Sequence, residues 1–169
     1  MDKKSEWIIK ELKILEDQKR WDDCIVFFKK SLKILKNKKY LYICINYFFM
    51  NLLLEEDYNY DDKIEYYYEN LAFKYFNKSY KIFKNDSEYL YFTGKIVTQC
   101  TWYFKITEDF PNIMIKKAIK LKPYSYISRI EFLSEKYWQV SKKNYPKLEK
   151  KMKRYGSFGK YFLSIYFKN

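Results

Sequence analysis

The stretch KRWDDCIVFFKKSLKI, Lys19–Ile34, determines the expected fold. Four of its residues recur at intervals of three, four and three positions: Trp21, Cys24, Phe28 and Ser31. This spacing places all four side chains on one side of an α-helix. Because two of the four are small, we expect a neighbouring helix to approach closely along that side.

Helix-period spacing continues along nearly the whole chain, and strand-like alternation is scarce. Only three glycines and three prolines interrupt it, and Pro111, Pro123 and Pro146 suit positions near helix ends. The sequence therefore predicts an all-α fold. The expected helices cover residues 5–17, 20–36, 39–54, 62–84, 87–105, 111–121, 125–140, 145–155 and 158–167.

Three segments of the chain have similar surroundings. They are FFKKSLKI around Ser31, YFNKSYKI around Ser79 and MIKKAIKL around Ala118. The separations are 48 and 39 residues, and each equals 34 residues plus an insertion, of 14 and 5 residues. Recurrence at such distances indicates a helical repeat.

A period of about 34 residues is that of the tetratricopeptide repeat, and the chain resembles this family. The family's second helix has an aromatic, a small, an aromatic and a small residue at the spacing of the opening stretch. Cys24 and Ser31 stand where the family usually has alanine. In the first helices, Gly94 keeps the family's glycine and Asn46 departs from it, while AIKLKP, residues 118–123, is close to the family's repeat end.

The resemblance implies a single helical-repeat domain over residues 1–169. Residues 5–140 would form degenerate repeats, as antiparallel helix pairs stacked into a short superhelix. Residues 141–169 would form basic C-terminal capping helices. The alternative is an irregular helical bundle in which the small-residue spacing is accidental.

The composition describes a folded and strongly basic protein. The chain of 169 residues is 48% hydrophobic and has a net charge of +13. Of its 34 basic residues 31 are lysines, and lysine has AT-rich codons, so part of this charge can follow from the base composition of the gene. The net charge alone is therefore weak support for a nucleic-acid partner.

The sequence gives no sign of a membrane span or a signal peptide. No apolar run approaches the roughly 18 residues that a membrane span needs. The N-terminal segment MDKKSEWIIKELKILED carries charge throughout and lacks an apolar core. Cys24, Cys44 and Cys100 are odd in number and far apart, which predicts reduced, buried thiols. We expect a cytoplasmic protein.

Several kinds of catalytic and metal site need residues that the chain lacks. Without histidine there is no Ser-His or Cys-His nucleophile pair, and three scattered cysteines cannot form a four-cysteine zinc site. Asp57, Asn59 and Asp61 resemble the alternating ligands of a calcium loop. However, Asp62 occupies the glycine position of that loop and Tyr68 the closing glutamate position. We expect a protein that is not an enzyme and that needs no metal and no cofactor.

Two segments of opposite charge and one implied groove hold the candidate partner-binding residues. Residues 55–69 carry seven carboxylates and one lysine, while residues 141–169 carry nine basic residues and one acid. In tetratricopeptide proteins the first helix of each pair lines a groove, and the resemblance implies that four side chains lie there. The candidates are Tyr40, Tyr47, Tyr91 and Lys95 in the groove, with Glu55, Glu56, Asp57 and Asp61 in the acidic segment. The alternatives are that Tyr40 and Tyr47 pack in the core and that the acidic segment is a solvated helix N-terminus.

Together these features predict a non-catalytic protein–protein binding module. One candidate within this class is an immunity- or antitoxin-type inhibitor that neutralises a toxin domain by charge-complementary contact. The alternative is a basic helical-repeat protein that binds nucleic acid, which requires lysines on one continuous face that also displays tyrosines. The basic tail by itself is compatible with nucleic acid, an anionic membrane, an acidic protein or a plain capping role.

Overall fold

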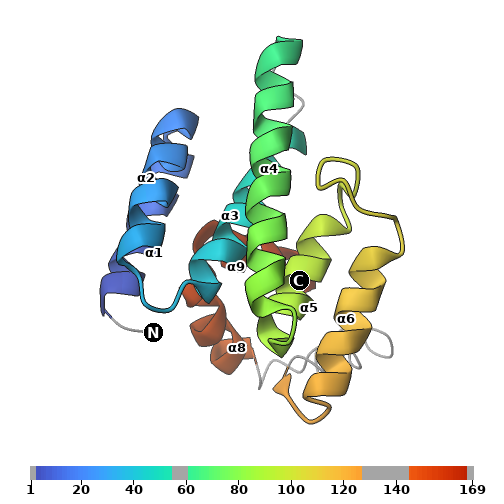
Figure 1. Ribbon diagram of the computed structural model, residues 1–169. Helices are drawn as coiled ribbons and strands as arrows, with labels where there is room; N and C mark the ends of the chain where they lie inside the picture. Colours follow the sequence, from blue (N-terminus) through green and yellow to red (C-terminus); the bar gives the residue numbers. More distant parts are fainter. Residues whose placement is uncertain (1–2, 55–60, 127–144, 167–169) are drawn as a thin grey trace. The chain divides into compact units, whose positions relative to one another are not determined.

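The computed structural model describes residues 3–54, 61–126 and 145–166 (Figure 1). Every regular element within these residues is a helix, which confirms the predicted all-α class. The described residues divide into two compact units: unit 1 holds 3–44 and 145–166, and unit 2 holds 45–54 and 61–126. In this part of the chain no helix has the length and apolar character needed to cross a membrane.

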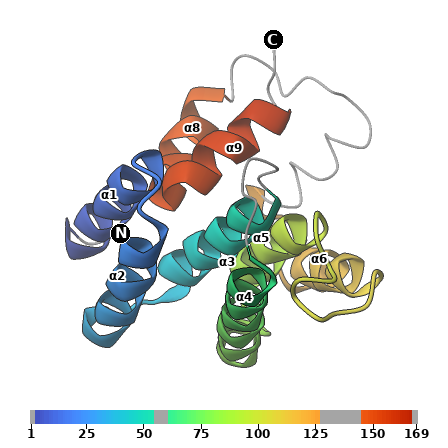
Figure 2. The ribbon, with the colours of Figure 1, turned by 90° about the horizontal axis from the view of Figure 1, so that it is seen from above.

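Unit 1 brings together the two ends of the sequence. It contains α1 (Lys3–Asp17), α2 (Trp21–Ile34), the beginning of α3 (Lys39–Leu54), α8 (Tyr145–Met152), the 3₁₀-helix η1 (Lys153–Tyr155) and α9 (Gly156–Tyr166). We call α8, η1 and α9 the C-terminal hairpin. Helix α1 packs against α2 and also against η1 and α9 (Figure 2). The described part of the basic tail, for which a capping role is expected, therefore packs on the first helix of the chain through η1 and α9.

The four spaced residues of the opening stretch lie on α2, and three of them are buried. Cys24 and Phe28 have no exposed surface, and Ser31 is 1% exposed. Trp21, the first residue of the helix, is half-buried. The predicted burial of this helix face is thus confirmed for the three interior positions.

Unit 2 contains the rest of α3 together with α4 (Asp62–Phe83), α5 (Ser87–Val97) and α6 (Phe110–Leu121). Helix α5 packs against both α4 and α6. The Asp86 carboxylate caps α5 by accepting a hydrogen bond of 2.9 Å from the backbone amide of Tyr89. Pro111 lies in the first turn of α6, where its missing amide hydrogen leaves no helical bond unmade.

Small residues lie at the helix contacts of unit 2. A Cβ atom added to Gly94 would lie 2.9 Å from a side-chain atom of α6, so glycine allows α5 and α6 to pack closely. The Ser87 hydroxyl donates to the Ala118 carbonyl oxygen at 2.8 Å. Between α4 and α5, the hydroxyl oxygens of Ser79 and Tyr89 are 2.6 Å apart in a buried hydrogen bond. Ser79 and Ala118, which lie in two of the three similar segments of the sequence, thus take part directly in helix contacts.

Some predicted boundaries differ from the structure. The helix expected over 87–105 ends at Val97, and the amides of Gln99 and Cys100 bond to carbonyls three residues back instead of four. The chain then turns at Lys105, which has a φ of 53°. The helix expected over 145–155 tightens into η1 after Met152. Most of the helix expected over 125–140 lies outside the described residues.

Candidate functional site

The predicted groove residues differ in how far they are exposed. Tyr91 has no exposed surface and Tyr47 is 7% exposed, so both rings contribute to packing. Tyr40 and Lys95 are half-buried, and Lys95 Nζ lies 5.6 Å from the ring centroid of Tyr91 on the same helix. Tyr47 therefore fits the alternative of core packing. A partner would reach Tyr91 only if the side chains around it moved.

The acidic candidates are represented by Asp61 alone, because Glu55, Glu56 and Asp57 lie outside the described residues. The Asp61 carboxylate accepts a hydrogen bond of 3.2 Å from the backbone amide of Lys63 and so caps α4. This is the usual role of an acidic residue before a helix. A part in partner binding remains a prediction for all four residues.

The concave surface that the structure adds is a groove between α1 and the C-terminal hairpin of unit 1. Its volume is about 760 Å³, within the rough range of 300–1,000 Å³ for ligand sites. Ile9, Met152 and Leu163 supply apolar lining. Six cations line the same groove: Lys10, Lys13, Lys150, Lys153, Arg154 and Lys160. Two carboxylates, of Glu6 and Glu149, leave a net charge of +4, and we call this surface the basic groove.

Two glycines shape the hairpin side of the basic groove. Gly156 has a φ of +55°, a region that favours glycine, and a Cβ atom there would lie 3.0 Å from Cγ2 of Ile9 on α1. A Cβ atom on Gly159 would lie 2.1 Å from the Met152 carbonyl oxygen. The first glycine therefore lets the hairpin lie against α1, and the second lets α9 lie against the end of α8.

Some of the groove cations are already engaged by neighbouring side chains. Arg154 Nη1 donates to the Tyr40 hydroxyl at 3.1 Å, and the guanidinium carbon lies 5.5 Å from the Tyr40 ring centroid. The Tyr40 ring in turn meets the ring of Tyr155 edge-on, with 5.5 Å between centroids. Tyr40, predicted as a partner-binding residue, thus positions a cation of the basic groove.

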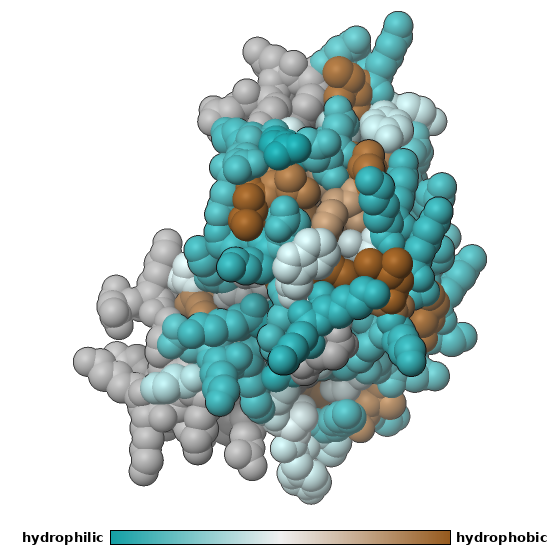
Figure 3. Space-filling model, turned by 90° about the vertical axis from the view of Figure 1, so that its left-hand side faces the viewer, coloured by the Kyte–Doolittle hydropathy of each residue, from teal (hydrophilic) through white to brown (hydrophobic). Residues whose placement is uncertain are grey.

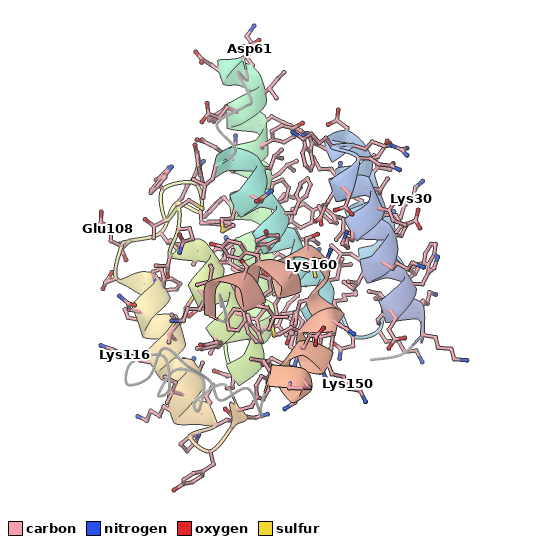
Figure 4. All side chains as sticks on the ribbon, turned by 180° about the vertical axis from the view of Figure 1, so that it is seen from behind. Lys30, Asp61, Glu108, Lys116, Lys150 and Lys160 are labelled. Carbon is pink, nitrogen blue, oxygen red and sulfur yellow. The ribbon has the colours of Figure 1, made fainter. Side chains whose placement is uncertain are left out.

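Among the remaining groove lysines, Lys13 is half-buried and paired, and the others are exposed. Lys13 pairs with Asp17, and their hydrogen bond raises the pKa of Lys13, so its ammonium group is charged at neutral pH. Lys10, Lys150 and Lys160 are exposed and come from α1, α8 and α9. Figure 4 shows Lys150 and Lys160 on the C-terminal hairpin. A negatively charged group in the basic groove would therefore be within reach of ammonium groups from several helices.

Glu16 is an ionisable residue at the contact between α1 and α9. The Ser157 hydroxyl donates to Glu16 Oε2. Burial raises the pKa of Glu16 to about 7, although the hydrogen bond from Ser157 acts in the opposite direction. This carboxyl group does not line the basic groove, so it bears on stability rather than on the charge of the groove.

The three cysteines are free and buried, as the sequence predicts. Burial raises the pKa of Cys24 and of Cys100 to about 12 and holds the pKa of Cys44 well above its usual value. The thiols are therefore protonated at neutral pH and are poor nucleophiles. Within the described ranges, no three metal-ligating side chains are grouped so that they could hold an ion. The basic groove, with its net charge of +4, is instead suited to bind negatively charged groups.

Exposed apolar side chains form a weaker candidate. On α1 and α2 they include Trp7, Val26 and Ile34. Trp7 packs edge-on against Phe27, with 6.0 Å between ring centroids. Figure 3 shows that hydrophobic areas on this face are interspersed with hydrophilic side chains. Single exposed apolar residues of this kind are normal for protein surfaces and define no site.

The sequence indicated only the hairpin half of the basic groove, through the charge of residues 141–169. It gave no signal for Lys10 and Lys13, whose contribution depends on the packing of α1 against the hairpin. Comparison with known proteins found no matching family model, no similar curated protein and no similar solved structure. The geometry of the basic groove is therefore the basis for assigning a function.

Proposed function

We propose that the protein is a non-catalytic binding module whose basic groove holds an acidic segment of a partner protein. The observation that carries this proposal is the placement of six cations around one concavity that also has apolar lining. Complementary charge steers such a partner and fixes its register, while contact with the apolar side chains excludes water.

The lining of the basic groove favours a protein partner over single-stranded nucleic acid. Proteins that bind single strands without sequence preference stack bases on aromatic rings. Tyr155 and Tyr161 of the C-terminal hairpin are not part of the groove lining. Tyr155 is buried, and Tyr161 is half-buried. A nucleic acid there would be held by phosphate contacts alone, and such binding weakens steeply with salt.

The proposal extends to an immunity- or antitoxin-type inhibitor. A toxin domain that presents an acidic surface would be blocked if that surface entered the basic groove. An inhibitor of this kind needs no catalytic group of its own.

We also propose that the helix pairs are tetratricopeptide-like repeats. The close approach at Gly94 and the contacts of Ser79 and Ala118 support this, because the family places small residues where its helices meet. The irregular bundle remains the alternative.

A titration with a labelled acidic peptide tests the groove assignment. The probe is a fluorescein-labelled oligoglutamate, followed by fluorescence anisotropy at low salt. We call the double substitution Lys10→Glu with Lys160→Glu the groove variant, and we expect it to bind the probe at least about tenfold more weakly, equivalent to about 1.4 kcal/mol. The matched control is Lys29→Glu with Lys30→Glu on α2, which changes the net charge equally but lies outside the groove lining.

Equal losses in the groove variant and in the α2 control would show that only the overall charge matters and would reject the groove. A labelled RNA provides the second comparison. Sub-micromolar, sequence-selective RNA binding at physiological salt would replace the protein-binding proposal with the nucleic-acid alternative, since nonspecific binding is roughly 10⁻⁴ to 10⁻⁶ M.

A further inference from the structure

The first two turns of α4 are exposed on nearly every side. Six of the seven residues from 61 to 67 are exposed, and the seventh, Glu65, is half-buried. The exposed residues include apolar and aromatic side chains, with Ile64 at 44% and Tyr66 at 62%. Asp61 stands at the tip of the helix (Figure 4). A helix end that exposes both carboxylates and large apolar groups has the composition of a docking segment.

We call residues 61–69 the acidic end of α4, and its carboxylates recur at helical spacing. Four carboxylates and one lysine give it a net charge of −3. Asp62, Glu65 and Glu69 follow one another at three and four residues, so they form a stripe about 10 Å long on one side of the helix. Tyr66 lies beside this stripe, one turn after Asp62.

Neighbouring side chains hold part of the stripe in place. The Tyr103 hydroxyl donates to Glu65 Oε1 at 3.2 Å. Lys105 Nζ lies 5.8 Å from the Tyr66 ring centroid and donates to Asn70 Oδ1 at 3.0 Å. Side chains that are already positioned lose less conformational entropy when they bind.

We propose that the acidic end of α4 of one molecule docks in the basic groove of a second copy of this chain. The proposal rests on the proposed function, because it uses the groove as a receptor for an acidic segment. The charges are complementary, at −3 for residues 61–69 and +4 for the groove lining. A groove of about 760 Å³ admits the side chains of one or two helical turns. Tyr66 supplies an apolar surface for Leu163 of the groove, which is half-buried.

Each copy carries both surfaces, so the contact is heterologous and joins molecules head to tail. Self-association then grows with protein concentration and is reversed by salt. A partner protein that enters the basic groove competes with the second copy, so self-docking lowers the fraction of grooves that are open to the partner.

Sedimentation of two complementary variants tests the docking. We call the double substitution Asp62→Asn with Glu65→Gln the α4 variant. It changes the net charge of residues 61–69 from −3 to −1 and leaves the basic groove intact, whereas the groove variant leaves the acidic end of α4 intact. Wild-type protein should self-associate at about 0.05 M salt and dissociate at about 0.5 M. Each variant alone should self-associate at least about tenfold more weakly. In an equimolar mixture, the acidic end of α4 of the groove variant can dock in the groove of the α4 variant. The mixture should therefore form a dimer, and no larger species, because no second intact pair of surfaces remains.

A wild-type chain that stays monomeric at low salt, or a mixture that forms no dimer, overturns the docking. The oligoglutamate titration on the same samples separates this failure from failure of the proposed function. If the probe binds wild type and α4 variant but not the groove variant, the groove takes acidic segments and only self-docking is wrong. If the probe binds none of them, both proposals are wrong.

Discussion

Glu16 should make the stability of unit 1 depend on pH. Burial raises the pKa of this carboxyl from 4.5 to about 7. Asp17 raises it further, whereas the Ser157 hydroxyl and Lys13 lower it. A group whose pKa is higher in the folded state binds its proton more tightly there, so its stabilising effect is complete below pH 4.5 and is lost as pH rises through about 7. Wild-type protein should therefore become less stable between pH 5 and pH 8.

The size of this loss follows from the shift in pKa. A shift of about 2.5 pKa units corresponds to about 3.4 kcal/mol, of which about 2.5 kcal/mol falls between pH 5 and pH 8. Because the side chain is not fully shielded from solvent, we expect a measured loss of about 2 kcal/mol. Glu16→Gln keeps an oxygen that accepts the hydrogen bond from Ser157 and removes the titrating proton. It should flatten the pH dependence and make the protein more stable than wild type at pH 8.

Urea unfolding at a series of pH values measures the effect as a free energy of unfolding. Glu6→Gln on the same helix is the control, because Glu6 is exposed. Ser157→Ala removes a donor to the charged carboxylate, so the midpoint of the pH dependence should move upward. If Glu16→Gln shows the same slope as wild type between pH 5 and pH 8, Glu16 is not the group responsible and the reasoning is refuted.

Two packing predictions accompany this one. Cys24→Leu should lower the free energy of unfolding by roughly 1–3 kcal/mol, because the site is fully buried, while Cys24→Ala should be nearly neutral; unchanged thermal melts for the leucine variant would contradict close packing. Gly159→Ala should cost about 3 kcal/mol or more, because its Cβ would lie 2.1 Å from the Met152 carbonyl oxygen, an atom of the backbone. Gly94→Ala is the matched comparison and should cost less, since the nearest atom, at 2.9 Å, is in the Ile115 side chain and can shift, and the nearest backbone atom, the Pro111 carbonyl oxygen, is 3.2 Å away. Equal losses would show that the hairpin glycine is not specially constrained.

The helices could be predicted because their signals are local. The helix expected over 39–54 has these same bounds in the structure, where the Lys39 amide donates to Asn37 Oδ1 just before it. The end of α5 at Val97 could not be predicted, because the helix-period spacing does not show where the backbone changes to bonds three residues back. Asn46, which departs from the family's glycine, is fully buried, and neither polar atom of its amide has a hydrogen-bond partner among the described residues. A sequence pattern alone cannot tell whether such a polar side chain is tolerated in a core.

The basic groove could not be predicted because its two sides are far apart in sequence. Lys10 and Lys160 come together only because Gly156 fits against Ile9 and brings the hairpin to α1. Such a match of shapes between distant segments leaves no periodic signal in either segment. The sequence shows the charge of residues 141–169, but it does not show the shape of the groove that part of this segment lines.

In a chain with 31 lysines, charge by itself says little about function, since a basic side chain occurs on almost any surface. The groove lysines differ from other surface lysines because the packing of the backbone places them around one concave surface. Gly159 brings α9 against the end of α8, and Gly156 sets the hairpin on α1, so both glycines are needed to place cations from α1, α8 and α9 around one hollow. A composition bias toward lysine explains how many cations there are, but it does not explain two glycines, of only three in the chain, at the positions that gather them. The geometry of the hairpin therefore supports the proposal of an acidic partner more strongly than the net charge does.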